Sequence, residues 1–117
     1  MLLSYQNTSE VLQAATQRDL YKNLIVQINK DLKYANLDCE FEYTITPQAL
    51  ANELCELIFN CINNKFADYL NLLYIVDVPE HQIKALDGSD LVKLTQNVVF
   101  LILKREYQKV WYKTRYI

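Results

Sequence analysis

Apolar residues recur with helical spacing through the first third of the chain. Those that share one side of a helical wheel are Val11, Ala14, Leu20, Tyr21, Leu24, Ile25, Ile28 and Leu32, and those opposite are Lys22, Asn23, Lys30 and Lys33. This pattern predicts one amphipathic helix over about residues 10–35. Asn7 followed three residues later by Glu10 is typical of a capping box, and Thr8 or Ser9 are alternative caps.

A second helix is predicted to begin at Thr46 and Pro47. The Thr hydroxyl can accept a hydrogen bond from a free N–H of the first turn, and the fixed φ of proline suits the first helical position. The apolar stripe that follows consists of Leu50, Leu54, Leu57, Ile58, Cys61 and Ile62. Helical spacing continues past a bend near Asn63 and Asn64 through FADYLNLLYIV. A strand over LLYIVDV is the alternative, because β-branched and aromatic residues are crowded there.

The last third of the chain predicts a short helix and then a long one. Asp77 and Glu80 form a second candidate capping box, and the short helix is expected to end at Gly88, where the backbone can turn left-handed. Ser89 is expected to cap the final helix, over about residues 90–113. Within it, VVFLIL is apolar on every side, which predicts the central element of a bundle.

One segment has the period of a strand instead. In CEFEYTIT, Cys39, Phe41, Tyr43 and Ile45 alternate with polar residues. A lone strand leaves its backbone unpaired, so this segment is expected to lie along the bundle, to pair with LLYIVDV, or to pair with its own copy in a second subunit. The predicted fold is therefore all-α, a small bundle of four to five helices in a single domain (1–117), with one extended segment near 39–46.

Composition supports a globular helical protein and excludes several classes of site. The chain has 117 residues, 51% hydrophobic and 22% charged, with a formal charge of −2. A single glycine leaves no phosphate-cradling loop, and the near-neutral charge gives no general attraction to nucleic acid or to an anionic membrane. Three cysteines without CxxC spacing indicate neither a disulfide framework nor a zinc ribbon.

The same features predict a soluble, cytoplasmic protein. The first residues, MLLSYQNTSE, carry no basic leader, and the longest apolar run is VVFLIL, which is far shorter than a membrane span. Unpaired cysteines fit a reducing compartment. We expect no membrane association.

The C-terminal stretch KREYQKVWYKTRYI is the strongest candidate for a binding surface. It holds five basic residues and only one acidic residue among its aromatic side chains. The candidate residues are Lys104, Arg105, Lys109, Tyr112, Lys113, Arg115 and Tyr116. On the helical wheel, however, Tyr107, Val110 and Trp111 share the core side, and cations are favoured at a helix C-terminus without any ligand. We therefore expect Trp111 to be buried and the basic residues to lie on the opposite side.

Two further patterns point to chemistry only weakly. The stretch PEHQIKALDGSDLVKLTQNVV resembles a helix-turn-helix. However, Asp87 and Asp90 lie where phosphates would approach, and the only obvious side chains for base contacts are Lys93, Gln96 and Asn97. His81 lacks an orienting carboxylate or a nearby nucleophile in the sequence, so an exposed position in a first helical turn is expected.

No catalytic, cofactor or metal site is predicted, and we expect no enzyme. Cys55 and Cys61 lie about 120° apart on a helix and do not converge on a metal. DGSD lacks the length and the closing glutamate of a calcium loop. The paired glutamates lack the contrasting environments that acid–base catalysis needs.

Two stretches, NLLYIVDVPE (71–80) and FLILKREYQKVW (100–111), resemble segments of short uncharacterised bacterial all-helical proteins. The resemblance implies an all-helical fold and no particular activity. Nine tyrosines in the chain favour protein contacts, since tyrosine buries a large ring while its hydroxyl can hydrogen-bond. The predicted function is a non-enzymatic interaction or structural module, with a second copy or another protein as partner. The alternative is weak nucleic-acid binding by the basic C-terminal helix, with Tyr112 and Tyr116 stacking on bases.

Overall fold

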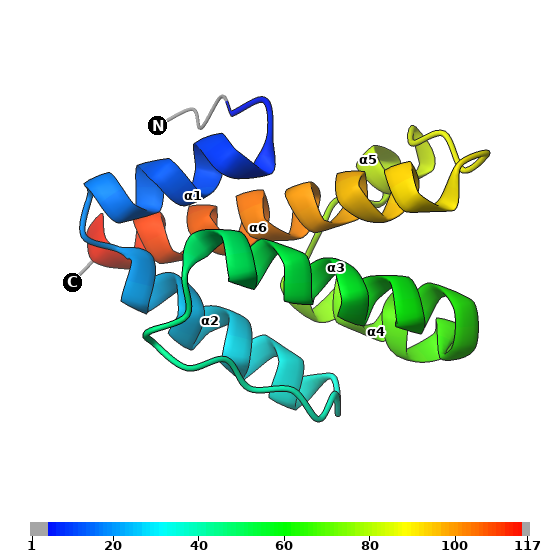
Figure 1. Ribbon diagram of the computed structural model, residues 1–117, viewed down its shortest axis with the longest axis horizontal. Helices are drawn as coiled ribbons and strands as arrows, with labels where there is room; N and C mark the ends of the chain where they lie inside the picture. The colour runs from blue at the N-terminus through cyan, green and yellow to red at the C-terminus, as the bar shows by residue number, and fades with distance from the viewer. Residues whose placement is uncertain (1–4, 116–117) are drawn as a thin grey trace.

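The computed structural model describes residues 5–115, which fold into six α-helices with no strand among them (Figure 1). The helices are α1 (Thr8–Gln17), α2 (Tyr21–Tyr34), α3 (Pro47–Asn64), α4 (Phe66–Val76), α5 (Glu80–Lys84) and α6 (Leu91–Arg115). The all-α prediction is therefore confirmed. Residues 5–115 contain one helix more than the upper figure of the predicted four to five, because the first predicted helix is divided in two.

Helix α6 is the central element, as its apolar run predicts. It extends along the long axis of the molecule, and α1, α2, α3 and α4 all contact it (Figure 1). Val98, Val99 and Leu103 are at most 1% exposed. A helix that is apolar on every side can only be stable when other helices cover each of its faces.

The predicted helix over residues 10–35 is wrong at its middle. Its backbone turns at Asp19, which has a left-handed φ of 58°, between α1 and α2. The N–H of Leu20 donates to the carbonyl of Ala15, which closes the end of α1 in the manner of a Schellman motif. Because of this turn, α1 and α2 can both pack on α6. A single straight helix over the same residues could not keep both of its halves against α6.

Asparagine and aspartate take the place that glycine usually has at helix ends. Positive φ values occur at Asp19 (58°), Asn36 (59°) and Asp77 (71°), at the ends of α1, α2 and α4. Among non-glycine residues, these two types tolerate the left-handed region best, because their short side chains can hydrogen-bond locally. Gly88, by contrast, has no positive φ, so its predicted left-handed turn is wrong.

The helix starts at Asn7 and Thr46 are confirmed. The side chain of Asn7 accepts a hydrogen bond from the N–H of Glu10 at 2.9 Å, and the Glu10 carboxylate accepts from the N–H of Gln6. Thr46 accepts from the N–H of Ala49, with Pro47 at the first helical position. Both caps satisfy donors that the first turn of a helix leaves free.

The bend predicted near Asn63 and Asn64 is a full break between α3 and α4 at Lys65. The alternative strand over LLYIVDV is wrong, because residues up to Val76 are helical. Leu72, Leu73 and Val76 are buried and recur with helical spacing, and α4 packs against α2, α3 and α6. Burial of this face outweighs the β propensity of the residue types.

Two predicted caps of the last third are replaced by others. Helix α5 has no side-chain cap, and Asp77 ends α4 instead of starting α5. Asp90, and not Ser89, caps α6, since its carboxylate accepts from the N–H groups of Val92 and Lys93. Lys93, Gln96 and Asn97 are exposed in the first turns of α6, but α5 before them is only five residues long, so the helix-turn-helix resemblance lacks a full first helix.

The alternating segment 39–46 lies along the bundle without a strand partner, which is one of its three predicted arrangements, but it turns at Tyr43 and Thr44, where the N–H of Ile45 donates to the carbonyl of Glu42. Phe41 is buried, and the side-chain amide of Asn29 both accepts from its N–H at 2.8 Å and donates to its carbonyl at 2.9 Å. The hydroxyl of Tyr21 donates to the carbonyl of Ile45 at 2.6 Å. Side chains of α2 thus take the place of a neighbouring strand for this backbone.

Candidate functional site

The predicted binding surface at the C-terminal end of α6 is largely bonded within the chain. Arg105 donates to the backbone carbonyl of Asp77 at 3.1 Å, to its carboxylate at 3.0 Å and to the side chain of Gln108 at 2.7 Å. These contacts join α6 to the C-terminus of α4. The guanidinium therefore ties two helices together.

Lys109 and Lys113 also have partners on other helices. The Lys109 ammonium lies 2.5 Å from the carboxylate of Asp31 in α2, 3.2 Å from the carbonyl of Val76 in α4 and 3.0 Å from the carboxyl of Glu106. The Lys113 ammonium donates to the side-chain oxygen of Gln27 in α2 at 2.6 Å. Lys109 thus lies where three helices meet.

The other members of the predicted surface lie beside aromatic rings. Lys104 is 5.7 Å from the ring centre of Phe100, and Arg115 is 4.3 Å from that of Trp111. The ring of Tyr112 meets Trp111 edge to face at 5.4 Å. Tyr116 falls outside the described residues. The role of these residues in binding remains a prediction.

The burial of the aromatic side of this helix is confirmed. Trp111 is 8% exposed, Tyr107 is fully buried, and Val110 is 3% exposed. The aromatic residues at the end of α6 therefore complete the core, whereas the side chains of Arg105 and Lys109 are only 27% and 19% exposed because they reach other helices.

A buried cluster of charged residues, absent from the sequence predictions, lies between α2 and α6. Glu106 is 1% exposed and Asp31 is 4% exposed, with Lys109 as the cation between them. Burial raises the pKa of Glu106 to about 9, helped by a hydrogen bond and repulsion from Asp31 and opposed by Lys109. At neutral pH the cluster therefore holds one proton on Glu106 and one ion pair between Asp31 and Lys109.

The same cluster keeps Lys109 charged. Burial by itself would lower the pKa of Lys109, but the hydrogen bond to Asp31 and the charge that Glu106 acquires at high pH outweigh burial, so that the pKa is raised. A signal for this cluster exists in the sequence: Asp31 and Glu106 occupy core positions of their helices, at helical spacing from Leu24 and Val99. Charged residues at such positions need a partner from another helix.

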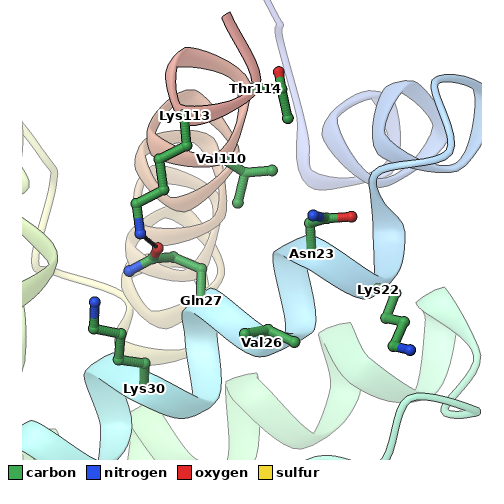
Figure 2. A pocket seen from close by; sticks show the side chains of 8 residues that line it. All are labelled: Lys22, Asn23, Val26, Gln27, Lys30, Val110, Lys113 and Thr114. Carbon is green, nitrogen blue, oxygen red and sulfur yellow. Dashed lines mark hydrogen bonds between the residues drawn. The ribbon is translucent and has the colours of Figure 1, made fainter. Parts of the chain in front are cut away.

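An open groove of about 520 Å³ lies next to this cluster, between α2 and the end of α6 (Figure 2). Its lining residues are Lys22, Asn23, Val26, Gln27, Lys30, Val110, Lys113 and Thr114. Three of them are lysines and none is acidic. The groove thus combines positive charge with an apolar wall.

The outer side of α4 is a second unusual surface. Phe66, Leu70 and Tyr74 are 53%, 50% and 83% exposed, and they follow one another at intervals of four residues. Residues at this spacing lie on one side of a helix. They form an apolar stripe, which we call the α4 stripe.

The described residues contain no arrangement that suggests metal or thiol chemistry. Within 5–115, no three His, Cys, Asp or Glu side chains lie close enough to hold a metal ion. Burial is the main factor that raises the pKa of the thiols of Cys39, Cys55 and Cys61, which disfavours the reactive thiolate. His81 lies exposed in the first turn of α5, as expected.

Across the part of the chain that the structure describes, no helix is both long enough and apolar enough for a membrane span. No protein-family model, curated protein or solved structure matches the chain. The resemblance to short bacterial helical proteins therefore stays a prediction.

Proposed function

We propose that this protein is a non-enzymatic helical module that associates with a second copy of itself through the α4 stripe. The observation that carries the proposal is the exposure of Phe66, Leu70 and Tyr74 along one side of α4. Single exposed apolar residues are common on protein surfaces, but a contiguous row is typical of a contact surface.

A second copy of the chain fits this stripe because an antiparallel arrangement makes it self-complementary. If a two-fold axis passes by Leu70, this residue meets its own copy, and Phe66 of one chain meets Tyr74 of the other. The two α4 helices then run antiparallel, so that their dipoles oppose each other.

The size of the stripe predicts a weak dimer. Its three side chains expose roughly 350 Å² per chain, if each aromatic ring contributes 150–250 Å² when fully exposed. Two such surfaces remain well below the roughly 1,200 Å² of a stable interface. We therefore expect a weak association and a protein that is monomeric when dilute.

Charged variants at Leu70 test both the contact and its symmetry. Leu70→Glu and Leu70→Lys each place like charges opposite each other across the two-fold axis, so neither variant alone is expected to dimerise. Mixed in equal amounts, they place glutamate opposite lysine, and association is expected to return to at least the wild-type level. Sedimentation equilibrium between 10 and 500 μM measures all three cases.

Val92→Glu is the matched control, since Val92 is 57% exposed on α6 and lines a groove toward α3. This variant is expected to dimerise like the wild-type protein. A wild-type protein that stays monomeric at 500 μM contradicts self-association. Dimerisation of Leu70→Glu alone contradicts the α4 stripe as the contact.

The nucleic-acid alternative has less support than self-association. Arg105, Lys109 and Lys113 have hydrogen-bonding partners within the chain, and those of Arg105 and Lys109 include carboxylates. Phosphate contacts by these residues would compete with bonds that hold α6 to α2 and α4. Lys104 and Arg115 have no carboxylate partner among residues 5–115. Two cations, however, give only a weak attraction to a phosphate backbone.

A further inference from the structure

We propose that the groove between α2 and α6 binds a small organic anion, with its oxyanion group between Lys30 and Lys113 and its apolar part on Val26. This site is separate from the α4 stripe, and the proposal does not depend on self-association. It rests on the charges, the walls and the rigidity of the groove.

Two ammonium groups converge on one place in the groove. Lys30 extends from α2 and Lys113 from α6, and both reach toward the side chain of Gln27 (Figure 2). Lys113 is bonded to the Gln27 oxygen at 2.6 Å, and Lys30 follows Gln27 by three residues, on the same side of the helix. Lys22 lies apart from them, with its ammonium 5.0 Å from the ring centre of Tyr43.

These two cations lack a compensating anion. Over residues 5–115, neither Lys30 nor Lys113 forms an ion pair, and no carboxylate lines the groove. Asp31 lies beneath, but Lys109 already neutralises it. An oxyanion between them would supply the missing negative charge and accept a hydrogen bond from each ammonium.

The walls of the groove favour a ligand with an apolar part. Val26 is 45% exposed, which is unusual for a valine in the middle of an amphipathic helix, and Val110 lies across from it on α6 (Figure 2). The volume of about 520 Å³ is within the range of small-molecule sites. An alkyl chain of about six carbons would cover Val26, so that its burial adds to the attraction of the charged end.

The floor of the groove is fixed in place. Gln27 is 5% exposed, and its amide donates to Asp31 at 3.2 Å while its oxygen accepts from Lys113. Asp31 is in turn held by Lys109. This chain of bonds across α2 and α6 orients the Lys113 ammonium before any ligand binds, which lowers the entropic cost of binding.

Titration with hexyl phosphate, followed by backbone amide chemical shifts of the full chain, tests the site. We expect saturable shifts at residues around Val26, Lys30 and Lys113, with millimolar affinity that weakens as salt is added. Hexanol keeps the alkyl chain but lacks the charged group, and inorganic phosphate keeps the charge but lacks the alkyl chain. Each is expected to bind at least about fivefold more weakly than hexyl phosphate. Hexanol binding as tightly as hexyl phosphate, or no saturable shift in this groove, overturns the proposal.

Charge-neutral variants separate the groove from general attraction of anions. Lys30→Gln and Lys113→Gln are each expected to weaken hexyl phosphate binding about fivefold, the effect of losing one partly screened ion pair. Lys33→Gln and Lys93→Gln remove exposed lysines that do not line this groove and are expected to bind as the wild-type protein does. Lys30 is exposed and forms no ion pair with residues 5–115, so its replacement is not expected to disturb folding. An unchanged affinity in Lys30→Gln therefore refutes the site.

Discussion

The Glu106→Gln variant is expected to be more stable than the wild-type protein at pH 8, whereas the two proteins should differ little near pH 4.5. Glutamine has nearly the shape of a protonated glutamate, and its amide can still donate to Asp31. It differs in having no proton to lose. The variant therefore isolates the contribution of one buried carboxyl group to the pH dependence of stability.

The sign of this effect follows from the raised pKa of Glu106. In the folded protein the pKa of Glu106 is raised from an ordinary value of 4.5 to about 9. Burial is the largest cause, and the neighbouring Asp31 is the second. Between these values the folded state holds a proton that the unfolded state has released, so the free energy of unfolding falls as the pH rises. Over the three pH units from 5 to 8, the loss is on the order of 4 kcal/mol in the wild-type protein.

Urea unfolding at pH 5, 6, 7 and 8 measures this difference. The wild-type midpoint is expected to fall across the series, and that of Glu106→Gln to change much less. Glu56→Gln, at an exposed position of α3, is the matched control and should follow the wild-type protein. If Glu106→Gln and the wild-type protein show the same pH dependence, Glu106 does not carry a buried proton.

Replacing Trp111 with alanine is expected to cost about 3 to 5 kcal/mol, the range for truncating a large buried aromatic. Trp111 is 8% exposed and belongs to the core that α6 shares with the surrounding helices. Tyr112 packs edge to face on its ring, and the Arg115 guanidinium lies 4.3 Å from the ring centre, so these contacts are lost as well. Such a loss is a large share of the stability of a small domain.

Two measurements check the burial of this side chain. Trp111 is the only tryptophan of the chain, so the emission spectrum of the folded protein reports on it alone and is expected to be blue-shifted. Thermal unfolding of Trp111→Ala should occur at a clearly lower temperature than that of Tyr34→Ala, which truncates a ring that is 64% exposed. Red-shifted emission together with an unchanged melting temperature in Trp111→Ala would refute the packing of this segment.

The helical fold was readable from the sequence because its signals are local. The stripe of α3, its Thr46 cap with Pro47 and the fully apolar run in α6 each depend on residues within a few turns of one another. Local periodicity also predicted the burial of Trp111, since this residue continues the core side of α6. The same information left LLYIVDV open between helix and strand, because the residue types favour one and the spacing favours the other.

The candidate binding surfaces were only partly readable. The row of Phe66, Leu70 and Tyr74 is visible in the sequence as apolar residues, but their exposure is decided by which side of α4 the other helices cover. Likewise, the predicted basic surface counted Lys109 as available for a ligand. Its partners, Asp31 and Val76, lie 78 and 33 residues away in the chain.

The sequence alone determined that the chain is helical, where α3 begins and which helix lies at the centre, since hydrophobic periodicity and capping act between neighbouring residues. Tertiary structure alone decided where the first helix breaks at Asp19, which lysines have partners, and that Glu106 keeps its proton. These properties depend on burial and on charges from distant segments, whose effects grow strongly as water is excluded. A position on a helical wheel shows that a residue faces inward, but only the packed helices determine what it meets there.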